Sequence, residues 1–133
     1  MQVSNIAQLL FSRVVDDSKF IDHFVTENRK RLYNSYSILK QTMLELNIPI
    51  IEANSGIFMF INLSKYLPVN SFEGERELSR MMKEKYRMIF TPGEACHCLL
   101  PGYYRVCYAF YFDINALYEC CDRIRKMISE LIN

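Results

Sequence analysis

Arg105 is the residue best suited to chemistry in this sequence, because it is a permanent charge inside an apolar strand pattern. It lies in the stretch Tyr103 to Phe112 (YYRVCYAFYF), among tyrosine, valine, cysteine and phenylalanine. A buried guanidinium is costly unless an anion meets it, and its planar fork fits a carboxylate through two parallel hydrogen bonds. Two other interpretations stay open: a structural ion pair with a core Glu or Asp, and a strand-edge arginine that reaches solvent.

The segment Cys96-His97-Cys98 has the residue types of a metal site, with Cys107 as an extra ligand. Zinc sites usually separate paired cysteines by two to four residues, whereas one residue separates these, and the other histidine, His23, lies in a distant helix. A Cys–His nucleophile pair needs both side chains within reach, which adjacent residues rarely allow. We therefore predict no metal site and interpret the segment as a loop with reduced thiols.

The lysines do not have the surroundings of a nucleophile. All seven lie in predicted helices or polar turns, where nothing apolar would lower the amine pKa: Lys19, Lys30, Lys40, Lys65, Lys83, Lys85 and Lys126. The sequence also contains no glycine-rich phosphate loop and no convincing pair of carboxylates. Taken alone, the residues offer one anion-binding candidate and no catalytic group.

Composition limits the class of protein. The chain has 133 residues, half of them hydrophobic and 14% aromatic, which predicts one folded domain with a real core. Sixteen Lys and Arg face fifteen Asp and Glu, so the net charge of +1 favours neither nucleic acid nor a membrane surface as partner. No apolar run approaches the ~20 residues of a membrane helix, and no signal pattern opens the chain. Five cysteines, an odd number, favour a reduced, cytoplasmic protein.

The elements that position these residues follow from apolar periodicity. Four segments with helical spacing predict helices: residues 5–15, a long helix capped by Asp16-Asp17-Ser18 and ended by Asn47 and Pro49, one starting near Ser71, and one capped by Asp113 or Asn115. In the third helix, Asn70 and Glu73 have capping-box spacing, and Gly74 is expected to weaken the first turn. Strands are predicted at Ile50-Ile51, Gly56–Leu63 (covered on both faces), Arg87–Phe90 and Tyr103–Phe112. The fold class is α+β, a small sheet covered by helices.

Several short motifs together resemble a known family. They are Gly56-Ile57-Phe58, Phe72-Glu73, Thr91-Pro92-Gly93, Pro101-Gly102 and Arg105-Val106-Cys107, along with Cys96-His97-Cys98. In order and spacing they are similar to the C-terminal part of the 1-aminocyclopropane-1-carboxylate synthases, in the class I aminotransferase superfamily of fold-type I pyridoxal-phosphate enzymes. The upstream stretch VSNIAQLLFSRVVDDSKFIDHFVTENRKRL also resembles them, so the similarity covers nearly the whole chain.

The resemblance implies a fold, a site and a cofactor. Residues 16–133 are expected to form the small C-terminal domain, and residues 1–15 the end of a large-domain or interdomain helix. In the family pattern the arginine of the R-V-C-(F/Y)-A strand, here Arg105, binds the substrate α-carboxylate. Pyridoxal 5'-phosphate is held by the large domain, so we expect neither cofactor binding, nor catalytic residues, nor activity from this chain alone.

The leading hypothesis is therefore the carboxylate-binding small domain of an aminotransferase or 1-aminocyclopropane-1-carboxylate synthase-like enzyme that acts on amino acids. The resemblance implies that the full-length enzyme is a homodimer. Transamination, elimination and cyclisation all stay open, as does the origin of the short chain as a fragment, a separate domain or a degenerate relative. The alternative is a non-catalytic aminotransferase-like interaction or sensor domain that kept the fold and lost the chemistry.

Overall fold

A computed structural model describes residues 4–109 and 113–132 of the chain. The chain divides into two compact units, residues 1–33 and residues 34–133. The first unit contains helix α1 (Asn5–Asp16) and the first part of the long helix α2 (Ser18–Glu45). No residue of α1 is buried, and its apolar side chains are exposed. The expected domain boundary after residue 15 stays a prediction.

The ends of α2 follow the predicted chemistry. The Asp17 carboxylate accepts the backbone N–H of Phe20 at 3.0 Å, which satisfies one donor of the first turn. At the other end Asn47 adopts the left-handed conformation, with φ 53°, and Pro49 follows. The predicted apolar stripe is buried only towards this end, where Leu39 and Met43 enter the core of the second unit.

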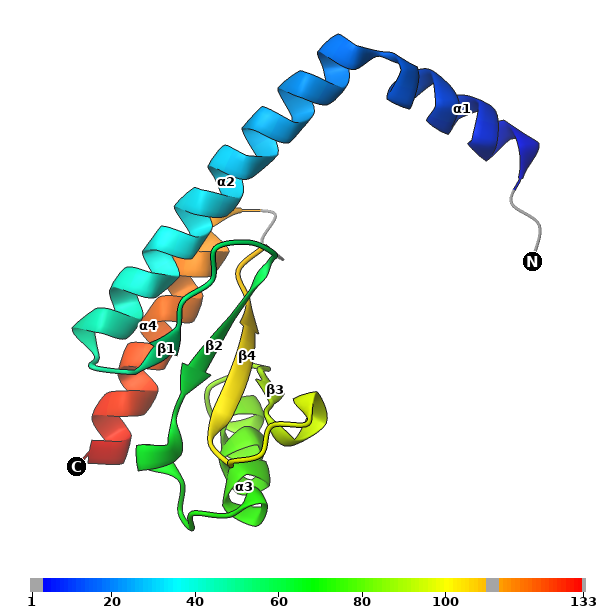
Figure 1. Cartoon of the computed structure of the whole chain (residues 1–133). Helices are drawn as coiled ribbons and strands as arrows, with labels where there is room; N and C mark the ends of the chain where they lie inside the picture. Colours follow the sequence, from blue (N-terminus) through cyan, green and yellow to red (C-terminus); the bar gives the residue numbers. More distant parts are fainter. Residues whose placement is uncertain (1–3, 110–112, 133) are drawn as a thin grey trace. The chain divides into compact units, whose positions relative to one another are not determined.

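The second unit is built on a four-stranded antiparallel sheet (Figure 1). Its strands lie in the order β1-β2-β4-β3 and are all paired antiparallel. Their bounds are β1 (Ile50–Ile51), β2 (Phe58–Asn62), β3 (Thr91–Pro92) and β4 (Tyr103–Cys107). The remaining elements are the 3₁₀ turns η1 (Ser64–Tyr66) and η2 (Glu94–Cys96) and the helices α3 (Phe72–Glu84) and α4 (Ile114–Ile132). The predicted α+β class is confirmed.

One face of the sheet carries the core. Met59 and Ile61 of β2 and Tyr104 and Val106 of β4 are buried with apolar side chains of α3, α4 and the C-terminal part of α2, which lie on one side of the sheet in Figure 1. On the other face side chains are half-buried or exposed, and Phe58 is 39% exposed. The prediction that β2 is covered on both faces is therefore wrong for the part of the chain described, since its helices cover one face.

Two strand predictions need correction. Residues 87–90 form no strand, although Met88 and Phe90 are buried and Ile89 is 81% exposed, as in a strand. Buried and exposed side chains do alternate along residues 88–90. However, Arg87 turns the chain with φ 56°, and pairing with β4 begins only at Thr91. Strand β4 is also shorter than predicted, because pairing ends at Cys107; residues 110–112 lie outside the described residues.

The last helix agrees with its predicted start and stripe. The Asp113 carboxylate accepts the backbone N–H of Asn115 at 3.0 Å, so Asp113 is the cap. Four members of the predicted stripe are buried and Leu131 is half-buried; the four are Leu117, Cys121, Ile124 and Ile128.

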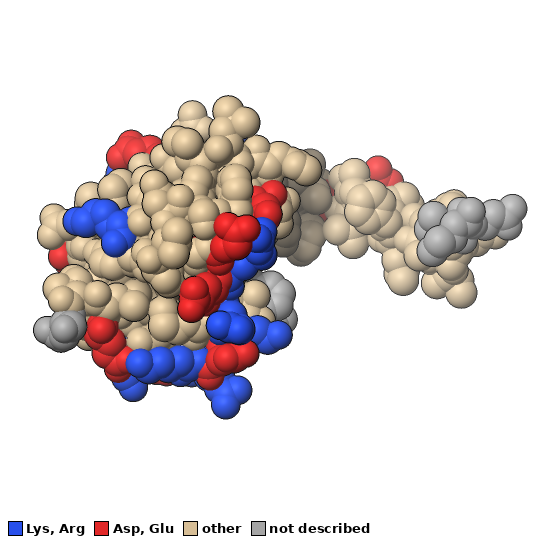
Figure 2. All heavy atoms as spheres, turned by 90° about the horizontal axis from the view of Figure 1, so that it is seen from below, with Lys and Arg blue, Asp and Glu red and all other residues tan. Residues whose placement is uncertain are grey.

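Along the described chain no helix combines the length and apolar character needed to span a membrane. Acidic and basic side chains are interspersed in the view of Figure 2.

The start of α3 differs from the predicted capping box. The cap is Ser71, one residue after Asn70, and its hydroxyl accepts the backbone N–H of Gly74 at 3.3 Å. Gly74 is expected from propensity to weaken the helix, yet the fold needs a glycine there. A Cβ at this position would lie 2.0 Å from the backbone carbonyl oxygen of Val69.

Replacing Gly74 with alanine is therefore expected to lower the free energy of unfolding by about 2 kcal/mol, the usual size of an overpacking penalty, despite the gain in helix propensity. Chemical denaturation followed by circular dichroism measures this loss. Lys83→Ala, at an exposed position of the same helix, is the control and should stay within about 0.5 kcal/mol of the wild type. Equal stability of both variants would contradict the close backbone approach.

Candidate functional site

Arg105 lies on the open face of the sheet, opposite Phe60 of β2 and Thr91 of β3. Its guanidinium carbon is 4.3 Å from the centre of the Phe58 ring, which belongs to a diagonal neighbour across the β2–β4 pair. The Nε atom is buried and has no hydrogen-bond partner among the described residues. A buried N–H donor of a charged group without a partner is unfavourable, so the site is incomplete as it stands.

The structural ion pair left open by the sequence is absent from the described part of the chain. Within residues 4–109 and 113–132 no carboxylate lies within 4.0 Å of the Arg105 nitrogens. The side chain is half-buried, so it does not extend freely into solvent either. The arrangement can accept an anion from outside this part of the chain, and a planar carboxylate matches the guanidinium edge.

A buried carboxylate holds the start of β4 in place. Glu75 of α3 is fully buried, and its two oxygens accept the backbone N–H groups of Glu94 at 2.9 Å and Gly102 at 2.6 Å. These two residues lie at the two ends of the loop that leads into β4. Because Gly102 directly precedes β4, the Glu75 carboxylate ties the strand that carries Arg105 to helix α3.

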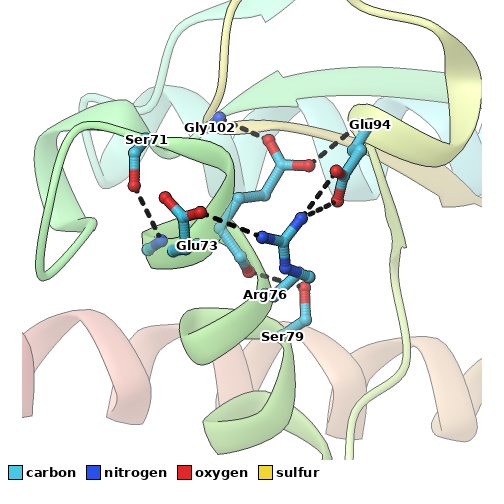
Figure 3. A network of polar contacts seen from close by, with 8 residues as sticks. Ser71, Glu73, Arg76, Ser79, Glu94 and Gly102 are labelled. Carbon is cyan, nitrogen blue, oxygen red and sulfur yellow. Dashed lines mark hydrogen bonds and ion pairs between the residues drawn. The ribbon is translucent and has the colours of Figure 1, made fainter.

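Surface contacts reinforce this anchor (Figure 3). Arg76 donates from Nη1 to both carboxylate oxygens of Glu94, at 2.6 and 2.8 Å, and Nη2 reaches Glu73 at 3.4 Å. Ser79 donates its hydroxyl to the backbone carbonyl of Glu75 at 2.8 Å. The exposed ion pairs of Arg76 contribute little singly, so the buried Glu75 carboxylate carries most of the anchoring.

Tyr104 is the buried neighbour of Arg105 on the core side of β4. Its hydroxyl donates to the backbone carbonyl of Glu75 at 2.8 Å, so the strand is also linked to α3 from within the core. Burial raises the pKa of the Tyr104 hydroxyl to about 12, because the phenolate would lose its hydration. The hydroxyl therefore stays protonated and remains a donor across the neutral range.

Stability is expected to fall as the pH rises from 10 to about 12, since the unfolded chain releases the Tyr104 proton near pH 10 and the folded chain retains it. The loss should reach on the order of 2–3 kcal/mol, at about 1.4 kcal/mol per pKa unit. Urea unfolding below pH 10 and just below pH 12 measures it. Lys40 and Lys85, whose pKa values are raised by Glu52 and Glu130, add to the same loss of stability at high pH. The test is therefore the difference in this loss between the wild type and Tyr104→Phe. An equal loss in that variant would contradict the assignment.

Of the residues considered as metal ligands, Cys107 lies on the same face of β4 as Arg105, opposite Phe58. Cys96 lies in η2, and His97 follows it with a left-handed φ of 57° and an exposed side chain. Among the described residues no disulfide involves any of the five cysteines, and no three His, Cys, Asp or Glu side chains cluster as metal ligands. Six lysines are exposed, and the seventh, Lys40, binds Glu52 at 2.6 Å. None of these amines fits a cofactor-bearing lysine.

Sequence reasoning misses two residues that shape the site. Glu75 is not singled out in the sequence, although its spacing of three and seven from the buried Leu78 and Met82 places an acid on an apolar helix face. That placement is the signal that could have found it. Phe58 reads as an ordinary strand residue, because its contact with Arg105 depends on a β2–β4 register that no local pattern reveals.

Comparison with known proteins identifies the relatives of this chain. Residues 1–124 match the family model described as aminotransferase class I and II. The chain is 34% identical over 130 residues to 1-aminocyclopropane-1-carboxylate synthase 9 of Arabidopsis thaliana, covering 98% of this chain and 27% of the relative. It is 33% identical over 107 residues to synthase 3 of Solanum lycopersicum, covering 80% and 23%. The chain thus spans about a quarter of the length of these curated relatives.

Solved structures show the same fold. The aromatic aminotransferase from Pyrococcus horikoshii OT3 superposes with a TM-score of 0.74 at 19% identity, over 89% of this chain and 29% of that protein. YbdL from Escherichia coli, described with a methionine aminotransferase function, superposes with a TM-score of 0.75 at 16% identity, over 94% of this chain and 31% of that protein.

Proposed function

The chain belongs to the aminotransferase class I and II family of pyridoxal-phosphate-dependent enzymes, and we propose on this basis that it is the small domain that binds the substrate carboxylate. The substrate class is an amino acid, and the enzyme is a transferase or lyase of the 1-aminocyclopropane-1-carboxylate synthase-like group. The complete enzyme acts as a cytoplasmic homodimer in which a large domain holds the cofactor.

The observation that carries this proposal is the incomplete Arg105 site. A half-buried guanidinium faces the open side of the sheet, with a buried Nε that has no partner among the described residues. An α-carboxylate supplies the charge and the planar pair of acceptors that the guanidinium lacks. Fixing this end of the amino acid orients the rest of the molecule, a contribution that can be worth several kcal/mol to the reaction.

The cofactor belongs to the part of the enzyme that this chain does not provide. Pyridoxal phosphate supplies an electron sink when it is bound. The lysines described here are exposed or ion-paired, and the pKa values of Lys40 and Lys85 are raised by their carboxylate partners, which is the opposite of what a nucleophilic amine needs. The proposed contribution of this chain is therefore binding and orientation.

A titration of the ¹⁵N-arginine-labelled chain with L-alanine tests the proposal. We expect the Arg105 side-chain signals to shift saturably, with a dissociation constant on the order of millimolar for one ion pair. Ethylamine, which lacks only the carboxylate of alanine, is the control and should leave these signals in place. Equal responses to the two compounds, or none to either, would contradict carboxylate binding and favour the non-catalytic interaction or sensor domain.

A further inference from the structure

The contact between Phe58 and Arg105 differs in kind from the contacts of Arg76 and Arg123. Arg76 and Arg123 use their donors on carboxylates or backbone carbonyls. Arg105 instead lies over an aromatic ring, with 4.3 Å between its guanidinium carbon and the ring centre. A ring contact consumes none of the five N–H donors of a guanidinium in a conventional hydrogen bond. It therefore stabilises the charge while leaving the donor edge available.

The strand register makes this contact a fixed feature of the sheet. Phe58 pairs with Cys107 and Phe60 pairs with Arg105, so Phe58 is the diagonal neighbour of Arg105 on the same face. The Nε atom of the same guanidinium is buried and has no hydrogen-bond partner among the described residues, so the ring is the contact that the structure records for this group. Both strands are paired along this stretch, so the two side chains leave rigid backbones that limit their relative movement.

We propose that Phe58 is a positioning residue, whose ring holds the Arg105 guanidinium in one orientation with its donor edge free for the substrate carboxylate. This inference rests on the proposed function. The attraction between a cation and an aromatic face requires the ring itself, so an aliphatic side chain of similar volume cannot replace it. Tyrosine keeps the ring, whereas leucine keeps only the apolar bulk.

The test compares Phe58→Leu with Phe58→Tyr in the ¹⁵N-arginine-labelled chain. In the wild type we expect the ring current of Phe58 to move the Arg105 Nε–H signal upfield, and we expect Phe58→Leu to abolish this displacement and Phe58→Tyr to retain it. The affinity for L-alanine should fall about fivefold in Phe58→Leu and less than about twofold in Phe58→Tyr. Circular dichroism spectra of both variants check that the fold is intact.

The failure of this inference is distinguishable from that of the proposed function. Phe58→Leu with an unchanged Nε–H signal, or with wild-type affinity while Arg105→Gln loses binding, overturns the role of Phe58 and leaves the carboxylate site standing. Equal loss of affinity in the leucine and tyrosine variants also overturns it, because the aromatic ring would then not be the cause. A wild-type chain that does not distinguish L-alanine from ethylamine overturns both proposals.

Discussion

Replacing Arg105 with glutamine is expected to weaken L-alanine binding about 100-fold, to the point where the titration shows no saturation, because the charge-assisted hydrogen bonds to the carboxylate are lost. Arg105→Lys keeps the charge but loses the planar fork, and should weaken binding about tenfold. The order wild type, lysine, glutamine is the signature of bidentate carboxylate binding. It is read from the ligand signals of L-alanine, which report binding independently of the arginine label.

Arg80→Gln is the matched control for this series. Arg80 is an exposed arginine of α3, and its replacement removes the same charge from the same unit without touching the open face of the sheet. We expect its affinity for L-alanine to equal that of the wild type. A similar loss in Arg80→Gln and Arg105→Gln would show that the net charge of the chain, and no particular site, attracts the ligand.

Removing the Glu75 carboxylate is expected to cause the largest loss of stability among single changes near the site. Glu75→Ala leaves the backbone N–H groups of Glu94 and Gly102 without their buried acceptor. Two hydrogen bonds to a charged group, at about 2 kcal/mol each, predict a decrease of about 4 kcal/mol in the free energy of unfolding. Glu75→Gln retains one acceptor oxygen and should lose about half as much.

Hydrogen exchange at single amides makes this test local. The Gly102 and Glu94 amides should lose protection in both Glu75 variants. Glu77→Ala, which removes an exposed carboxylate from the same helix, should leave their protection unchanged. A Glu75→Ala chain with wild-type stability and a protected Gly102 amide would show that the loop before β4 is held by other contacts.

Local chemistry predicts the helices of this chain well. The caps at Asp17 and Asp113, and the left-handed Asn47 before Pro49, act within a few residues of sequence and are found where the pattern places them. Strand pairing is harder to predict from the local sequence. Residues 87–90 alternate as a strand does, but whether a partner lies alongside depends on the path of β4, which no local signal encodes.

The residues of the candidate site also differ in how well the sequence predicts them. Arg105 is visible in the sequence because a charge inside an apolar strand requires an explanation. Glu75 is less visible, since acids are common in first helical turns, and only its place on the buried face of α3 distinguishes it. The role of Phe58 cannot be predicted from the sequence, because it follows from a diagonal contact between strands that are far apart along the chain.

A crystal structure of the chain soaked with L-alanine would show directly whether Arg105 binds the carboxylate of an amino acid. We expect both carboxylate oxygens on the guanidinium edge of Arg105, at N···O distances of about 2.7–2.9 Å, with the Phe58 ring still against the guanidinium. An ion pair between Arg105 and a carboxylate of its own chain would contradict carboxylate binding by Arg105. An amino acid bound elsewhere, with no ligand at Arg105, would contradict it as well.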